Sequence, residues 1–278
     1  MKSLYDEVSM QCSRKITRAY STSFSLGIST LAKRFHDPIY SIYGFVRLAD
    51  EIVDSFHDFD KSELLRRFRE ETVRAVEEKI SINPVLNCFQ QTVHQYKIDW
   101  ALVDGFLKSM EMDLERKQYD RSGYQQYIYG SAEVVGLMCL RVFVEGNEEQ
   151  YKELEPFAMK LGSAFQKVNF LRDLRADTQG LGRNYFPQIQ SQVDETDWKV
   201  SIENEIREEF HAAWIGIRKL PRGARLGVYV AYKYYLMLFH KIQSLPAEEI
   251  LQSRVRVPDR TKARILVVSA CRHYLRLL

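Results

Sequence analysis

Two short acidic clusters, far apart in the chain, are the residues with the clearest potential for chemistry. Asp50 and Asp54 bound the first cluster, and Asp173 and Asp177 bound the second. In a helix that rises about 1.5 Å per residue, aspartates four apart lie on one face, roughly 6 Å from each other. Like charges at that separation repel unless a cation lies between them. If both faces turn toward one cavity, they form a magnesium site whose remaining coordination positions suit a phosphorylated substrate.

The surroundings of the first cluster favour a functional role. Residues 39–49, immediately before it, are almost wholly apolar, so the helix is mostly buried where its acids occur. Buried carboxylates need a cation or strong hydrogen bonds. A structural pair on an exposed helix is the alternative for this motif taken alone.

The second cluster offers more ligands on one helix face. Asn169, Asp173 and Asp177 lie at i, i+4 and i+8, and Gln166 precedes them on nearly the same side. Three nearby cations could hold a leaving diphosphate or pair with the acids, and they are Arg172, Arg175 and Arg183. Salt bridges among these charges are the structural alternative.

The elements that must position these residues are helices. Apolar residues recur at intervals of three and four from residue 5 onward, and only 13 Gly and 7 Pro interrupt the chain. The predicted spans are 4–20, 22–32, 37–55, 61–79, 83–96, 99–115, 121–145, 149–178, 196–219, 222–244 and 259–277. We therefore expect one all-α domain over 1–278, a helical bundle with a central cavity.

Breaker residues set several of these boundaries. Pro38 is expected to start the helix of the first acidic cluster, and Asn83-Pro84 the helix at 83–96. Gly146-Asn147 ends one helix, and the glycines at 180 and 182 close the long helix that carries the second cluster.

Composition excludes several classes of protein. Forty basic against thirty-seven acidic residues leave a formal charge of +3, which does not indicate a nucleic-acid binder. The four cysteines form no zinc motif, so free thiols in a reducing cytoplasm are expected. No signal peptide and no uninterrupted apolar stretch of about 18–20 residues is present, so we expect neither export nor a membrane span.

The acidic clusters and the segments around them resemble the motifs of the squalene and phytoene synthases, a family of head-to-head prenyl synthases. The resemblance extends over nearly the whole chain, in the same order as in the family. Its segments are residues 20–25, the first acidic cluster with Tyr43 and Arg47, 127–136, 166–173 with Asp177, 220–225 and 254–258. A lone pair of aspartates would be weak evidence, but two such pairs in this context are strong.

The resemblance implies an isoprenoid-synthase fold in which the two aspartate motifs face each other and bind Mg²⁺, or Mn²⁺ in its place, with substrate diphosphate. One prenyl diphosphate would ionise, its leaving group stabilised by the metal and by arginines. The allylic cation would then attack a second prenyl diphosphate and lose a proton to give a cyclopropylcarbinyl diphosphate. A second ionisation and a rearrangement would yield the joined hydrocarbon.

The resemblance also assigns residue roles. The metal ligands would be Asp50, Asp54, Asn169, Asp173 and Asp177. The substrate-binding residues would be Ser21, Ser23, Phe24, Arg47, Gln166, Arg172, Arg183, Tyr235 and Arg254. The chain departs from many relatives at Ala176, where an acid is usual, and in a loop before Arg183 that is one residue longer.

Carbocations demand a dry cavity whose walls stabilise positive charge without attacking it, and aromatic faces do both. The candidates are Phe24, Tyr40, Tyr43, Phe45, Tyr129, Phe165, Phe170 and Tyr235. Tyr43, Tyr129 and Tyr235 match family positions near the substrates, and Tyr43 and Tyr129 are counted with the four aspartates as catalytic. The small residues at 130–132 and 136 suit either a polyprenyl tail or close helix packing.

Phytoene synthase, joining two C20 geranylgeranyl diphosphates in carotenoid biosynthesis, is the first expectation, because residues 254–258 resemble that branch. The alternatives are a C15-using squalene, dehydrosqualene or presqualene diphosphate synthase, a terpene cyclase, and a non-catalytic helical scaffold that binds a lipid or a partner. Phytoene synthesis needs no NADPH. We expect a cytoplasmic enzyme, peripheral on the inner face of the membrane, that hands its insoluble product to the bilayer or to a desaturase.

Overall fold

The structure is a computed structural model that describes residues 1–115, 118–180, 182–190, 195–250 and 254–275. These residues form helices throughout, and within them the only strand-like pairing is one isolated bridge between Gln118 and Asn184. The predicted all-α class is confirmed. The helices are α1 (Lys2–Tyr20), α2 (Thr22–Ser29), α3 (Lys33–Asp54), α4 (Lys61–Glu78), α5 (Pro84–Tyr96), α6 (Trp100–Glu115), α7 (Arg121–Ile128), α8 (Val134–Phe143), α9 (Glu148–Arg175), α10 (Pro187–Gln190), α11 (Glu195–Lys219), α12 (Arg222–Gln243), α13 (Ala247–Ile250) and α14 (Asp259–Tyr274).

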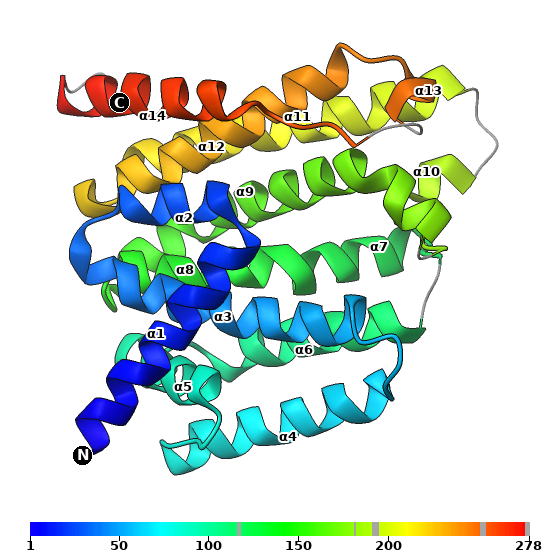
Figure 1. The fold of residues 1–278 in the computed structure, drawn as a ribbon. Helices are drawn as coiled ribbons and strands as arrows, with labels where there is room; N and C mark the ends of the chain where they lie inside the picture. The colour runs from blue at the N-terminus through cyan, green and yellow to red at the C-terminus, as the bar shows by residue number, and fades with distance from the viewer. Residues whose placement is uncertain (116–117, 181, 191–194, 251–253, 276–278) are drawn as a thin grey trace.

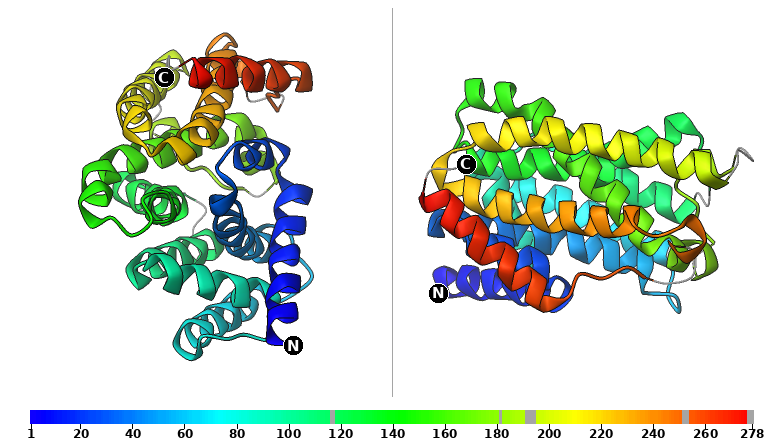
Figure 2. Two further views of the ribbon diagram at one scale, coloured as in Figure 1. Left: turned by 90° about the vertical axis from the view of Figure 1, so that its left-hand side faces the viewer. Right: turned by 90° about the horizontal axis from the view of Figure 1, so that it is seen from above.

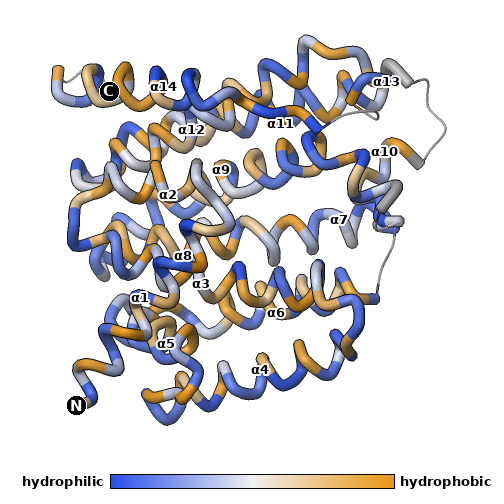
Figure 3. The backbone as a smooth tube through the Cα atoms, in the orientation of Figure 1, coloured by the Kyte–Doolittle hydropathy of each residue, from blue (hydrophilic) through white to orange (hydrophobic). Residues whose placement is uncertain are grey.

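The helices stack in layers from α4 at one side of the bundle to α14 at the other, with α9 near the middle (Figures 1 and 2). α9 packs against α8 on one side and α11 on the other, while α3 packs against α1 and α5. Most helices carry apolar residues in patches rather than all round (Figure 3), which is the pattern of helices that bury one face. None of the helices in the described ranges is long and apolar enough to cross a membrane.

The start of α3 differs from the prediction. The helix begins at Lys33, so Pro38 lies inside it rather than at its first turn. The earlier turn forms because Phe35 is fully buried and the Ala32 N–H donates to the carbonyl of Gly223 at 2.8 Å. The carbonyl that loses its donor to Pro38 belongs to Arg34, which is exposed, so water can bond it. By contrast, α5 begins at Pro84 as predicted, with the Asn83 side chain accepting from the Val85 N–H.

Two predicted helices contain π-helical turns. The span predicted at 121–145 consists of α7, the π segment η1 (Tyr129–Glu133) and α8, and the long helix α9 continues into η2 (Ala176–Gly180). At η1 the backbones approach closely, since a Cβ on Gly130 would lie 2.6 Å from the carbonyl oxygen of Gly105. On the other side a Cβ on Gly162 would lie 2.6 Å from the carbonyl oxygen of Ala132. Glycine is therefore needed at both contacts that hold η1 between α6 and α9.

Candidate active site

A cavity of about 610 Å³ lies within the bundle and has a polar and an apolar part. Its walls come from α2, α3, η1, α8, α9, α11 and α12. Its apolar lining includes Leu31, Val135, Phe143, Leu154 and Phe157. The volume lies in the range of ordinary small-molecule sites.

Beside the cavity lies a second, smaller pocket of about 220 Å³, which we call the polar pocket. It shares eight lining residues with the cavity, so the two adjoin. The polar pocket is lined by Asp50, Val53, Asp54, Met110, Asp113, Tyr127, Gln166, Asn169, Phe170, Arg172, Asp173, Asp177, Arg183 and Tyr185. All five residues predicted as metal ligands are in this set. Asp50 and Asp54 lie at the C-terminal end of α3. Asp173 lies near the C-terminal end of α9, and Asp177 lies in η2.

The carboxylates of the polar pocket repel one another. Burial, followed by the charge of Asp54, raises the pKa of Asp50 to about 7. Burial, followed by the charges of Asp173 and Asp54, raises the pKa of Asp177 to about 7. The two motifs therefore lie close enough for each to penalise ionisation in the other, which is the electrostatic condition that a divalent cation relieves.

The donor set fits a hard divalent cation. Carboxylate and amide oxygens are the ligands that Mg²⁺ prefers, and no thiol or imidazole lines the polar pocket. Within the described residues, no three acidic, histidine or cysteine side chains already converge as a ready-made metal site. Arginine side chains contact several of these carboxylates.

These arginines come from three parts of the chain. Arg172 donates from its Nε to both oxygens of the Asp173 carboxylate at 3.1 Å, and the Arg254 Nε lies 2.7 Å from Oδ1 of the same carboxylate. Arg47 pairs with Glu51, lies 4.0 Å from Asp50 and has its guanidinium 4.3 Å from the centroid of the Tyr20 ring. The three predicted substrate-binding arginines Arg47, Arg172 and Arg254 all line the cavity, at the end where the acids lie.

Arg183 bridges the two aspartate motifs. Its backbone N–H donates to the carbonyl of Asp177 at 2.8 Å, and its Nη1 donates to the Asp54 carboxylate at 3.0 Å. The longer loop before it thus still brings the side chain into the polar pocket, while its role in binding substrate stays a prediction.

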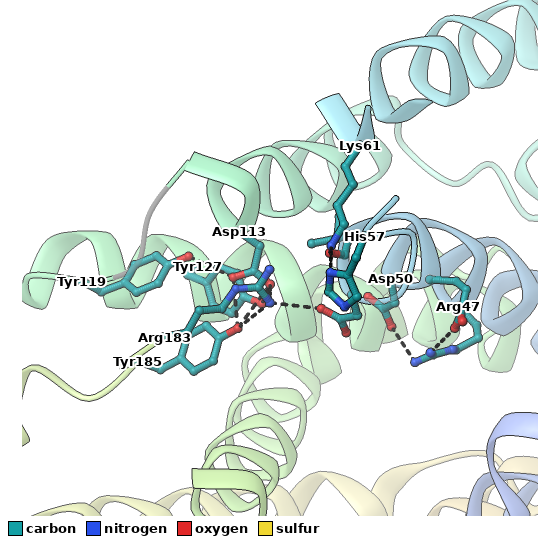
Figure 4. Close-up of polar contacts among 12 residues, drawn as sticks. Arg47, Asp50, His57, Lys61, Asp113, Tyr119, Tyr127, Arg183 and Tyr185 are labelled. Carbon is teal, nitrogen blue, oxygen red and sulfur yellow. Dashed lines mark hydrogen bonds and ion pairs between the residues drawn. The ribbon is translucent and has the colours of Figure 1, made fainter. Parts of the chain in front are cut away.

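Asp113 is a site residue that the sequence reasoning missed. Its side chain is 5% exposed and accepts hydrogen bonds from the hydroxyls of Tyr127 (2.7 Å), Tyr119 (3.1 Å) and Tyr185 (3.1 Å). The Nη1 of Arg183 lies 3.4 Å away, and Figure 4 shows these side chains gathered around Asp113. Burial raises the pKa of Asp113, and the charge of Arg183 opposes that rise. Asp113 lies three residues after Met110 and seven after Phe106, so it falls on the apolar face of α6, and that position was the available signal.

Aromatic side chains line the cavity beside the acids. The rings of Phe24 and Tyr43 lie 4.9 Å apart, and those of Phe165 and Tyr235 stack at 3.9 Å. The Tyr235 hydroxyl donates to the Asn169 side chain at 3.2 Å, which holds that predicted ligand in place. Ser21 also lines the cavity and caps α2 by accepting from the Phe24 N–H, whereas the Ser23 side chain lies outside the described residues.

Three of the predicted wall aromatics lie elsewhere. Tyr129 is 40% exposed and packs toward Gly105 of α6, and neither part of the cavity includes it. Two residues correspond to about 200° around a helix, so Tyr127 faces the cavity and Tyr129 points away. Tyr40 and Phe45 are buried in the core, where Phe45 stacks on Phe89 at 3.9 Å. Phe170 lies against the polar pocket and not the larger cavity.

Replacing Tyr127 by Phe is expected to lower turnover at least about tenfold, because the loss of its hydroxyl removes the shortest hydrogen bond to Asp113 beside the acids. Replacing Tyr129 by Phe removes the same atom from an exposed ring and should leave turnover within about twofold. Steady-state kinetics of the two variants, measured side by side, check this. Equal losses in both would contradict the assignment of Tyr127 to the site.

Sequence comparison then decides the family. A profile described as squalene/phytoene synthase matches residues 17–192. The chain belongs to the squalene/phytoene synthase family. Members of this family are prenyltransferases and head-to-head synthases of isoprenoid biosynthesis, so membership sets aside the terpene cyclase as a class.

Relatives within the squalene/phytoene synthase family have two product types. The chain is 24% identical to the 4,4'-diapophytoene synthase of Staphylococcus haemolyticus over 73% of this chain and 69% of that protein. It is 26% identical to the 15-cis-phytoene synthase of Synechococcus elongatus over 93% and 91% of the two chains. A crystal structure of a dehydrosqualene synthase with ligand superposes with a TM-score of 0.83 at 22% identity, covering 98% of each chain. The last likeness concerns the fold alone.

Proposed function

We propose that this family member is a Mg²⁺-dependent phytoene synthase that joins two molecules of geranylgeranyl diphosphate. The observation that carries the proposal is that the polar pocket, with the five predicted oxygen ligands and its arginines, adjoins an apolar, aromatic-walled cavity. A diphosphate head and a polyprenyl tail need these two environments side by side. Similarity to phytoene synthases along nearly the whole chain supports the C20 substrate.

Bound Mg²⁺ would supply Lewis-acid stabilisation of the departing diphosphate. The residues that would hold the metal ion are Asp50, Asp54, Asn169, Asp173 and Asp177. The chain's own residues do the rest of the positioning. Arg47, Arg172 and Arg254 lie where they can bind diphosphate oxygens in exchange for the carboxylates that they now contact. Tyr43, Phe165 and Tyr235 present ring faces and apolar surface that would shelter a cation from water.

A C15-using synthase is the second candidate, because the likeness to a 4,4'-diapophytoene synthase favours it. Cavity depth would distinguish the two substrates, and Phe143 and Phe157 are among the residues that line its apolar part. We also propose that the hydrocarbon leaves at a membrane surface, where the class of enzyme that must consume it is a desaturase.

Incubation of the purified protein with Mg²⁺ and either geranylgeranyl or farnesyl diphosphate tests the proposal. We expect a C40 hydrocarbon from the C20 substrate, with and without NADPH, identified by mass spectrometry of the extract. A C30 product formed in preference would move the protein to the C15 branch. No dimeric product from either substrate would overturn the proposed function.

A further inference from the structure

Positive charge is concentrated on two helices. α12 and α14 together contain eight Lys and Arg residues and a single acid, Asp259, whereas the whole chain has a formal charge of only +3. The rest of the molecule is therefore net negative. Such a separation creates a local positive potential that attracts an anionic partner to one side of the molecule.

Most of these cations have no counter-ion. Within the described residues, Arg222, Lys233, Arg260, Arg264 and Arg272 take part in no ion pair or side-chain hydrogen bond. Several arginines on other helices pair with carboxylates, and examples are Arg34 with Glu145, Arg66 with Glu63 and Arg141 with Glu148. What distinguishes α12 and α14 is that cations so outnumber acids along both helices.

The outward face of α14 carries basic and apolar side chains together. Arg260, Arg264, Val267, Cys271 and Tyr274 follow one another at intervals of four and three residues, so they form one stripe, and all five are exposed. Val267 is 61% and Tyr274 77% exposed, and Val268 beside the stripe is 49% exposed. The opposite face, with Ile265 and Ser269, is buried. We call the outward faces of α12 and α14 the basic-apolar surface.

This surface lies directly behind a wall of the active-site cavity. α14 packs along α12 at the outside of the bundle (Figures 1 and 2), and the inner face of α12 lines the cavity with Gly227, Val228 and Tyr235. At the start of α14 the Lys262 Nζ lies 3.5 Å from the hydroxyl of Thr22, which is adjacent to the cavity residue Ser21. The basic-apolar surface and the place where an insoluble hydrocarbon forms are therefore on the same side of the molecule.

We infer that the basic-apolar surface docks on a bilayer containing anionic phospholipid, with α14 lying in the interface. A helix face on which exposed apolar side chains lie beside Lys and Arg can bind in this way, through apolar burial and attraction to anionic lipid. A second copy of the chain fits the surface poorly, because a symmetric contact would bring the same unpaired cations together. The reason given for docking, product delivery, rests on the proposed function, but the binding itself does not.

Sedimentation with vesicles tests the inference on the full chain. The protein should bind phosphatidylcholine vesicles that contain phosphatidylglycerol and should bind pure phosphatidylcholine vesicles much more weakly. The double variant R260E/R264E should reduce the partition coefficient at least about tenfold, because each cation near an anionic bilayer contributes about 1 kcal/mol. V267S should reduce it further when added to that background, because apolar burial is lost.

The matched control is R67E/R74E on the exposed face of α4, which makes the same change in net charge on the opposite side of the bundle. It should retain binding within about twofold. Turnover of detergent-dispersed substrate should be unchanged in both double variants, so a failed proposed function and a failed docking surface give different results. Absence of binding to anionic vesicles, equal losses in the two double variants, or a dimer in solution that only R260E/R264E dissociates would each overturn the inference.

Discussion

Replacing Asp50 or Asp173 by Asn is expected to reduce turnover at least about a thousandfold while leaving the helical content unchanged. Each aspartate belongs to one of the two motifs that face each other across the polar pocket. Stabilising a departing diphosphate is worth several kcal/mol, and about 4 kcal/mol corresponds to three orders of magnitude in rate. The fold should persist because the change is isosteric and reduces repulsion among buried acids, since burial and Asp54 already raise the pKa of Asp50 to about 7.

Single-turnover kinetics and far-ultraviolet circular dichroism would measure the two parts of this expectation. Asp58→Asn is the matched control, since Asp58 is exposed just beyond α3 and lies outside the polar pocket. Chelation of divalent cations should reproduce the loss in the unmodified protein, and added Mg²⁺ should restore turnover there but not in the variants. Wild-type rates in either aspartate variant would defeat the metal proposal.

Replacing Asp113 by Ala is expected to destabilise the fold by about 3–5 kcal/mol. The truncation leaves three tyrosyl hydroxyls without their buried acceptor and leaves the guanidinium of Arg183 with Asp54 as its remaining acid, and unsatisfied buried polar groups together carry costs of this size. Asp104→Ala on the same helix removes an acid that pairs with Arg69 and Lys108 but is 21% exposed. That change should cost about 1 kcal/mol or less.

Urea unfolding of the two variants and the unmodified chain would compare their free energies of unfolding. A shift in the midpoint can be interpreted as a change in stability only if the m-value stays constant. Equal costs for the two substitutions would show that the hydrogen-bonded cluster around Asp113 contributes no more than a surface ion pair.

Much of the fold was predictable because local signals agree with one another along this chain. The boundary at Asn83-Pro84 combines a side-chain cap with a proline suited to the first turn, and the structure begins α5 there. The predicted start of α3 was wrong, because tertiary contacts extend the helix at its N-terminus. Burial of Phe35 and the contact of Ala32 with Gly223, a residue far along the chain, extend the helix past the point where Pro38 alone would start it.

The candidate site was predictable to the extent that chemistry depends on spacing. Residues four apart on a helix share a face whatever surrounds them, so the aspartate pairs and Asn169 could be grouped from sequence. Which tyrosine faces the cavity could not be decided in this way. Tyr127 and Tyr129 differ only by the rotation of the helix that carries them, and that rotation is fixed by the glycine contacts of η1 with α6 and α9.

The sequence by itself determined the helical class, the family and the two acidic helix faces, because periodicity and spacing are local properties of the chain. Only the tertiary structure decided that Arg183 bridges the two motifs, that Asp113 is the shared acceptor of three tyrosines, and that the unpaired cations of α12 and α14 lie on one surface. These arrangements join residues far apart in the chain. Their distances depend on how helices pack, and the pattern within any single helix does not contain that information.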